Sequence, residues 1–155
     1  MVVDSYKKLV EDRHLKNLHI VLTSLMAELS KIGILNQGTT NVVGEGVGKK
    51  VARCIKDIHP DIPNDEKELI KFLIKFCDMC DDYIVEDEII GIKSDKCRYC
   101  PKQIGEAEIP GSACPIPSMI VSMLNELNGK KTHKIHLING KILMKKDGYC
   151  WFKIK

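Results

Sequence analysis

Residues 97–117 read CRYCPKQIGEAEIPGSACPIP, and the rest of the chain is best understood from this stretch outward. Its prolines and glycines exclude regular structure, and an ordered loop of this length needs something to hold it. Cys97-Arg-Tyr-Cys100 is a tight turn whose two thiolates can face one ion, and Cys114 lies at the far end of the same loop. Tetrahedral zinc takes cysteine ligands at such spacing, so the sequence predicts a loop closed on Zn²⁺.

The fourth zinc ligand has to come from another part of the chain. Cys150 is the first choice, because a final strand over 149–154 can return beside the strand that ends near Cys97. His133 and His136 are rivals, but residues three apart on a strand point to opposite faces, so at most one of them can reach the site. The predicted ligand set is Cys97, Cys100, Cys114 and Cys150.

A second pair of cysteines, Cys77 and Cys80, stands 16 residues before the first pair and completes a generic four-cysteine zinc spacing. A site of this kind would make a ribbon-like module that binds nucleic acid, and Cys80 remains a further rival as the fourth ligand. However, both cysteines continue the apolar face of a helix with Leu73 and Phe76, where free cysteines pack as small hydrophobic side chains. We therefore expect core packing for this pair.

Composition favours one globular domain over residues 1–155 in a cytoplasmic protein. Hydrophobic residues make up 44% and charged residues 29%, and no stretch approaches the roughly 20 apolar residues that span a bilayer. Seven cysteines without a secretion signal indicate a reducing compartment and metal binding rather than disulfides. The net charge is only +3, so a nucleic-acid partner is not expected.

The order of predicted elements is an α+β pattern, with helices packed on an antiparallel sheet. Apolar residues at three- and four-residue intervals predict helices over residues 4–33, from Asp4 or Ser5 as the cap, and over 39–58, 65–80 and 118–127. Alternating and β-branched residues predict one or two strands over 83–94 and strands over 132–138, 141–145 and 149–154.

Two glycines, Gly44 and Gly48, lie four residues apart on one face of the second predicted helix. The stretch is not a phosphate loop, since the spacing is one residue short and no Ser or Thr follows the lysine. We expect the glycines to let another helix approach closely, with a ligand-lined groove as the alternative. No histidine or aspartate is marked as the base of a nucleophilic cysteine, so no catalytic residue is assigned.

The stretch 97–117 and the closing residues 148–154, GYCWFKI, resemble archaeal members of the 4-vinyl reductase domain family. The resemblance implies a domain similar to the ligand-binding domains of nitric-oxide signalling and Golgi transport, which forms homodimers and binds small hydrophobic molecules. It also implies that Cys114 and Cys150 are the first and last zinc ligands. His133-x-x-His136 stands where that family has a Glu-x-x-Cys pair, so Cys97 and Cys100 would replace the pair.

The leading hypothesis is a zinc-stabilised domain that binds or senses a small hydrophobic molecule as a homodimer, with the metal in a structural role. A tetrapyrrole vinyl reductase, or an accessory to one, is the alternative that the family name suggests, although no residues mark a nicotinamide or flavin site. A zinc-ribbon-like nucleic-acid module is the third hypothesis. A binding protein is expected rather than an enzyme.

Overall fold

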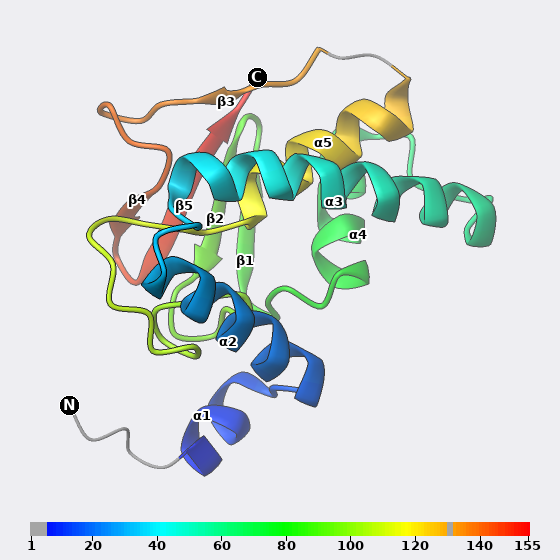
Figure 1. The fold of residues 1–155 in the computed structure, drawn as a ribbon. Helices are drawn as coiled ribbons and strands as arrows, with labels where there is room; N and C mark the ends of the chain where they lie inside the picture. Colours follow the sequence, from blue (N-terminus) through cyan, green and yellow to red (C-terminus); the bar gives the residue numbers. More distant parts are fainter. Residues whose placement is uncertain (1–5, 130–131) are drawn as a thin grey trace.

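The computed structural model describes residues 6–129 and 132–155, and in these residues five helices and five strands follow each other along the chain (Figure 1). The helices are α1 (Tyr6–Arg13), α2 (Asn17–Lys31), α3 (Gln37–Ile58), α4 (Glu66–Phe76) and α5 (Ile116–Asn128). The strands are β1 (Tyr83–Glu86), β2 (Ile89–Lys93), β3 (Ile135–His136), β4 (Met144–Lys146) and β5 (Tyr149–Ile154). The prediction of an α+β fold is confirmed.

The long first helix that the sequence predicts is in fact two helices. His14 has a φ of 53°, a left-handed backbone conformation that ends α1, and Lys16 caps the start of α2. The apolar spacing continues across this break, so periodicity alone could not reveal it. The expected caps Asp4 and Ser5 lie outside the described residues.

The next two helices also differ from the prediction at one end each. Asn36 and Thr39 form a reciprocal capping box: the Asn36 side chain accepts from the Thr39 N–H at 3.1 Å and the Thr39 hydroxyl accepts from the Asn36 N–H at 2.8 Å. The second helix therefore begins at Gln37. Asp65 caps α4, and this helix ends at Phe76 rather than near residue 80.

The sheet is antiparallel, in the order β1-β2-β5-β3, and β4 also pairs with β5. The final strand β5 thus returns beside β2, the arrangement that makes Cys150 the first choice of fourth ligand, and places Cys150 directly opposite Ile92. Alternate residues of the two strands point inward and are fully or almost fully buried: Ile90, Ile92, Phe152 and Ile154. Helices α4 and α5 pack against the sheet.

Helix α3 packs along α5, and its two glycines make the close approach possible (Figure 1). A Cβ atom added to Gly48 would lie 2.7 Å from the Met119 carbonyl oxygen and 2.8 Å from Ser122 Cβ, and one added to Gly44 would collide with Ser118. Ser122 Oγ also donates a hydrogen bond to the Glu45 carbonyl at 2.6 Å. The expected helix packing at Gly44 and Gly48 is confirmed, and no room remains there for a ligand.

Within the described residues, α1 and α2 pack on the cysteine loop rather than on another helix or strand (Figure 1). Met26 and Leu29 of α2 join Leu35, Ile109 and Ala113 in a small apolar cluster separate from the main core. In that same part of the chain, no helix is long and apolar enough to cross a membrane.

Replacing Gly48 tests the α3–α5 contact. Gly48→Ala should lower the free energy of unfolding by roughly 1–3 kcal/mol relative to Gly46→Ala, because its added methyl overpacks the interface. Gly46 is the matched control, since a Cβ there meets no atom within 4 Å and the gain in helix propensity is the same. Urea unfolding of both variants measures the difference; equal stabilities would mean that the helices are not in close contact.

Candidate metal centre

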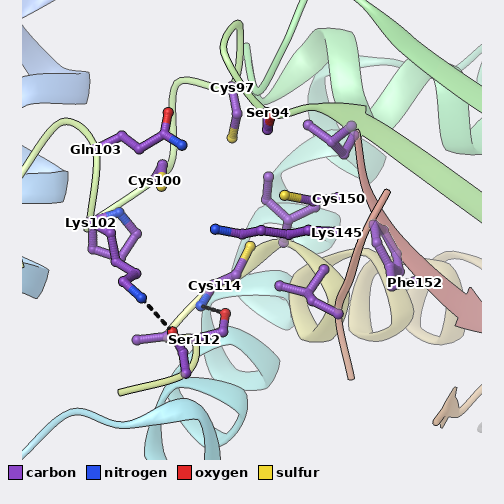
Figure 2. Close-up of a pocket in the computed structure, with 16 residues that line it drawn as sticks. Ser94, Cys97, Cys100, Lys102, Gln103, Ser112, Cys114, Lys145, Cys150 and Phe152 are labelled. Carbon is purple, nitrogen blue, oxygen red and sulfur yellow. Dashed lines mark hydrogen bonds between the residues drawn. The ribbon is translucent and has the colours of Figure 1, made fainter. Parts of the chain in front are cut away.

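The four cysteines of the predicted zinc site line one cavity of about 60 Å³ between the loop and the sheet (Figure 2). Cys97 and Cys100 come from the start of the loop, Cys114 from its end, and Cys150 from β5. The pairing of β5 with β2 brings them together, because Cys150 lies beside the end of β2 from which the loop departs. These four residues come from three separate parts of the sequence and share one cavity.

The rival ligands lie elsewhere. His133 Nε2 is 3.1 Å from Glu66 Oε2, and the His133 backbone exchanges two hydrogen bonds with the side chain of Asn125. His136 is on β3 and pairs with Lys153. Neither histidine lines the cysteine cavity, so the structure brings Cys150 and not these residues to the loop.

The second cysteine pair does not line the cavity either. Cys77 Sγ is 3.9 Å from Met123 Sδ on α5, and burial raises the pKa of this thiol to about 11. Cys80 is buried, and its thiol donates to the carbonyl of Asp82 at 3.2 Å. The expectation that both pack in or against the core is confirmed.

Backbone N–H groups point at two of the cavity sulfurs. The Tyr99 N–H donates to Cys97 Sγ at 3.4 Å, within the tight turn that the first pair of cysteines forms. Cys114 precedes Pro115, the N-cap of α5. Burial raises the pKa of its thiol well above the ordinary value, while a hydrogen bond from the Ile116 N–H opposes that rise. Such donors and a helix N-terminus favour a thiolate over a thiol.

Burial is the main electrostatic influence on these thiols. It raises the pKa of Cys97 to about 12 and also raises that of Cys150. The pKa of Cys114 rises further because three other cysteine sulfurs are near enough to repel its charge. Without a cation the thiols of Cys97, Cys114 and Cys150 therefore stay protonated near neutral pH, and a bound metal ion would take the place of their protons.

Positively charged side chains border the same cavity. Lys145 on β4 lies opposite Cys150, where burial raises the pKa of the thiol and the lysine charge opposes that shift. Figure 2 shows the Lys145 side chain running across the cavity between Cys150 and Cys114. Lys102 also lines the cavity and donates to the carbonyl of Gly111 at 2.8 Å, which ties the loop to itself.

The thiols surround the cavity without forming a finished coordination shell. Among residues 6–129 and 132–155, no three His, Cys, Asp or Glu groups are already close enough to hold a metal ion together. The donor set nevertheless fits zinc, which takes four thiolates at about 2.3 Å in a closed tetrahedral site. Binding would draw the four side chains inward.

Sequence reasoning missed residues that hold the loop in place. The Gln37 side chain accepts from the Cys114 N–H at 3.0 Å and donates to the Cys114 carbonyl at 3.0 Å, which fixes the backbone of one predicted ligand. The guanidinium of Arg13 donates to the carbonyl of Cys97. Gln37 carried no signal, whereas Arg13 is one of three arginines in the chain and could have been singled out.

Comparison with known proteins gives the family of the chain. The model of the MJ0207 family matches residues 33–155. The chain belongs to the MJ0207 family. Uncharacterized protein MJ1342 of Methanocaldococcus jannaschii is 62% identical over 109 residues, which cover 70% of this chain and 95% of that protein. No solved structure was found to match the chain.

Membership of the MJ0207 family corrects the resemblance to the 4-vinyl reductase domain family, which is wrong. That resemblance rested on a proline-bounded cysteine loop and a short final strand, two features that unrelated zinc loops can share. The implied relation to the nitric-oxide-signalling and Golgi-transport fold and the suggestion of vinyl reduction depended on it and are withdrawn. All four cysteines of the cavity lie inside the match to the MJ0207 family, whereas α1 and α2 precede it.

The burial of the cavity thiols predicts the order in which cysteines react. In protein freed of metal by a chelator, at mildly alkaline pH, iodoacetamide should modify Cys54 first and Cys97 and Cys114 last. Cys54 is exposed, whereas burial raises the pKa of the other two thiols and restricts access to them. Peptide mass spectrometry over a time course measures the order, and labelling of Cys97 as fast as Cys54 would contradict it.

Proposed function

We propose that this MJ0207-family protein is a zinc-binding domain in which Cys97, Cys100, Cys114 and Cys150 hold one Zn²⁺ ion. The observation that carries the proposal is the convergence of these four thiols on one cavity. The donors are soft sulfur atoms, and two of them receive backbone N–H groups that favour their charged form. Zinc is the metal that most often takes such a set.

The size of the cysteine cavity favours an ion over an organic molecule at this place. Pockets for organic ligands measure roughly 300–1,000 Å³, whereas this cavity measures about 60 Å³. The space is suited to one ion with its sulfur ligands.

The metal's role in this proposal is structural. Four thiolates complete the tetrahedral shell of Zn²⁺ and leave no position for a water or substrate. The ion, when bound, would join the two ends of an irregular loop to β5 and to the sheet. Cys97, Cys100 and Cys114 would anchor the loop, and Cys150 would supply the fixed point on the strand.

Metal analysis of cysteine variants tests the proposal. The wild-type chain should carry one zinc ion, and Cys114→Ser should lose it because a hydroxyl is a poor substitute for a thiolate ligand. Cys80→Ser and Cys54→Ser are the matched controls and should keep the metal. In cobalt-substituted protein, the visible absorption should be that of a tetrahedral thiolate site and should disappear in Cys114→Ser.

Two outcomes would decide against this assignment. Wild-type protein that binds neither zinc nor cobalt would remove the metal site. Loss of zinc in Cys80→Ser with retention in Cys114→Ser would instead move the site to the other cysteine pair.

We also propose that two copies of the chain associate through α2. The outer face of this helix carries exposed apolar side chains at helical spacing, and Leu18 is 79% exposed; the row is Leu18, Val21, Leu22 and Leu25. Since the opposite face already packs on the loop, α2 is apolar on two sides, which is typical of a helix covered on both. The row is uncharged and symmetric about its middle, so two antiparallel copies can bury it against each other.

Charge placed on this row should separate the copies. Wild-type protein should be a dimer by light scattering after gel filtration, and the double variant Leu18→Glu, Leu25→Glu should be a monomer with unchanged zinc content, because burying the two carboxylates is unfavourable. Val42→Glu is the control, since Val42 is exposed on α3 and lies outside the row. A monomeric wild type at high protein concentration would remove this interface.

A further inference from the structure

Arg13 is a buried arginine whose contacts all lead to the cysteine loop. Arg13 is the last residue of α1, and only 5% of the residue is exposed to solvent. The guanidinium donates to the carbonyl of Ser94 at 3.1 Å, to the carbonyl of Cys97 and to Oε1 of Gln103. These acceptors stand before, at and just after the Cys97–Cys100 turn.

Among residues 6–129 and 132–155, the groups that accept hydrogen bonds from the Arg13 guanidinium are all uncharged. Burying a cation is costly unless something nearby balances its charge. The neighbouring Arg98 is 3% exposed but has carboxylate partners: its Nη1 is 2.8 Å from Asp78 Oδ1, and it also pairs with Asp81. Arg98 Nε donates to the carbonyl of Arg13 at 2.7 Å, which holds the end of α1 in place. Arg98 is therefore locally neutralised, whereas the Arg13 guanidinium donates to residues that line the cysteine cavity.

The cavity offers the balancing charge when a metal is bound. A Zn²⁺ ion with four thiolates carries roughly two excess negative charges. Ser94, Cys97 and Gln103, the three residues to which the Arg13 guanidinium donates, all line this cavity. Outer groups that orient a ligand and balance its charge commonly change metal affinity by about 10–100-fold.

Arg13 lies outside the region of the chain that matches the MJ0207 family. The match to the MJ0207 family begins at residue 33, after α1 and α2 have ended. Gly105 of the loop lies directly beneath the Thr23 carbonyl of α2, so closely that a Cβ there would collide with it. The two N-terminal helices thus form a cover over the loop, and Arg13 is its charged contact.

We propose that Arg13 is a positioning residue of the zinc site: it fixes the backbone of Cys97 and balances part of the negative charge of the four-thiolate ion, which slows the loss of zinc. This inference rests on the proposed zinc site. It assigns to the N-terminal helices a part in metal retention that their sequence did not reveal.

The test compares variants at Arg13 with one at an exposed arginine. Arg13→Met keeps the aliphatic stem and removes the charge and the donors, Arg13→Lys keeps the charge and loses the planar fork, and Arg53→Met is the control, since Arg53 pairs with Glu126 on the surface. The rate of zinc release to a chromophoric chelator is measured for each folded protein, together with the visible spectrum of the cobalt form.

Arg13→Met should release zinc about 10–100-fold faster than wild type, with shifted cobalt–thiolate bands, and Arg13→Lys should fall between the two. Arg53→Met should behave as wild type. If Arg13 had a purely structural role, Arg13→Met would lower the stability of the protein but leave the cobalt–thiolate bands as in wild type. Arg13→Lys would then not restore slower zinc release.

The outcomes separate this inference from the proposed function. Wild-type protein without zinc removes the metal site itself. Wild-type protein with zinc, but with the same release rate and cobalt spectrum in Arg13→Met, overturns only the role of Arg13. If Arg13→Met does not fold, Arg13→Lys decides: faster release than wild type supports the role, and an unchanged rate overturns it.

Discussion

A long irregular loop has to satisfy its backbone polar groups without a helix or strand of its own, and the structure around residues 94–115 is arranged to do this. Internal turns supply some of the bonds, such as the Ile104 N–H to the Cys100 carbonyl at 3.0 Å. Other partners come from distant elements: the Arg98 N–H reaches the Met79 carbonyl at 2.9 Å, and Gln37 of α3 binds both backbone groups of Cys114. The loop is therefore fixed at both ends by residues outside it.

The two sides of the loop face different parts of the protein. Its inner side carries cysteines toward β5, while its outer side is covered by α2, where Gly105 lets the Thr23 carbonyl approach and Met26 packs near Ala113. Because α1 and α2 pack on this loop and not on the sheet, their position depends on the loop being ordered. Stabilising the loop from inside with a metal and from outside with helices are thus two parts of one arrangement.

The sequence was informative where a pattern is local and periodic. The order of the helices and strands and the α+β class followed from apolar spacing and turn residues. The break at His14 did not, because the apolar row continues on both sides of a single left-handed residue. The predicted start of α3 at residue 39 is too late, because the capping box of Asn36 and Thr39 starts the helix at Gln37.

The contacts of the site were harder to predict, for a physical reason. Arg13 binds backbone carbonyls more than eighty residues away, and any residue has a carbonyl, so no side-chain pattern marks the partner. The gathering of four cysteines was predictable because thiols are rare and their spacing has a known use. The family could not be predicted in the same way. Cysteines and prolines in a loop indicate how the loop is held in place, but unrelated families can share them.

Comparison of the buried cysteines within this one chain bears on whether the cavity thiols are core side chains or metal ligands. Cys77 is an example of a cysteine that packs against the core: its sulfur lies near Met123 Sδ, and burial alone raises the pKa of its thiol. Around the cavity, by contrast, features that favour a negative sulfur oppose the effect of burial. Cys97 and Cys114 receive backbone N–H groups, Cys114 stands at the start of α5, and Lys145 faces Cys150. A sulfur that only fills space gains nothing from such neighbours, whereas a thiolate bound to a cation is stabilised by each of them.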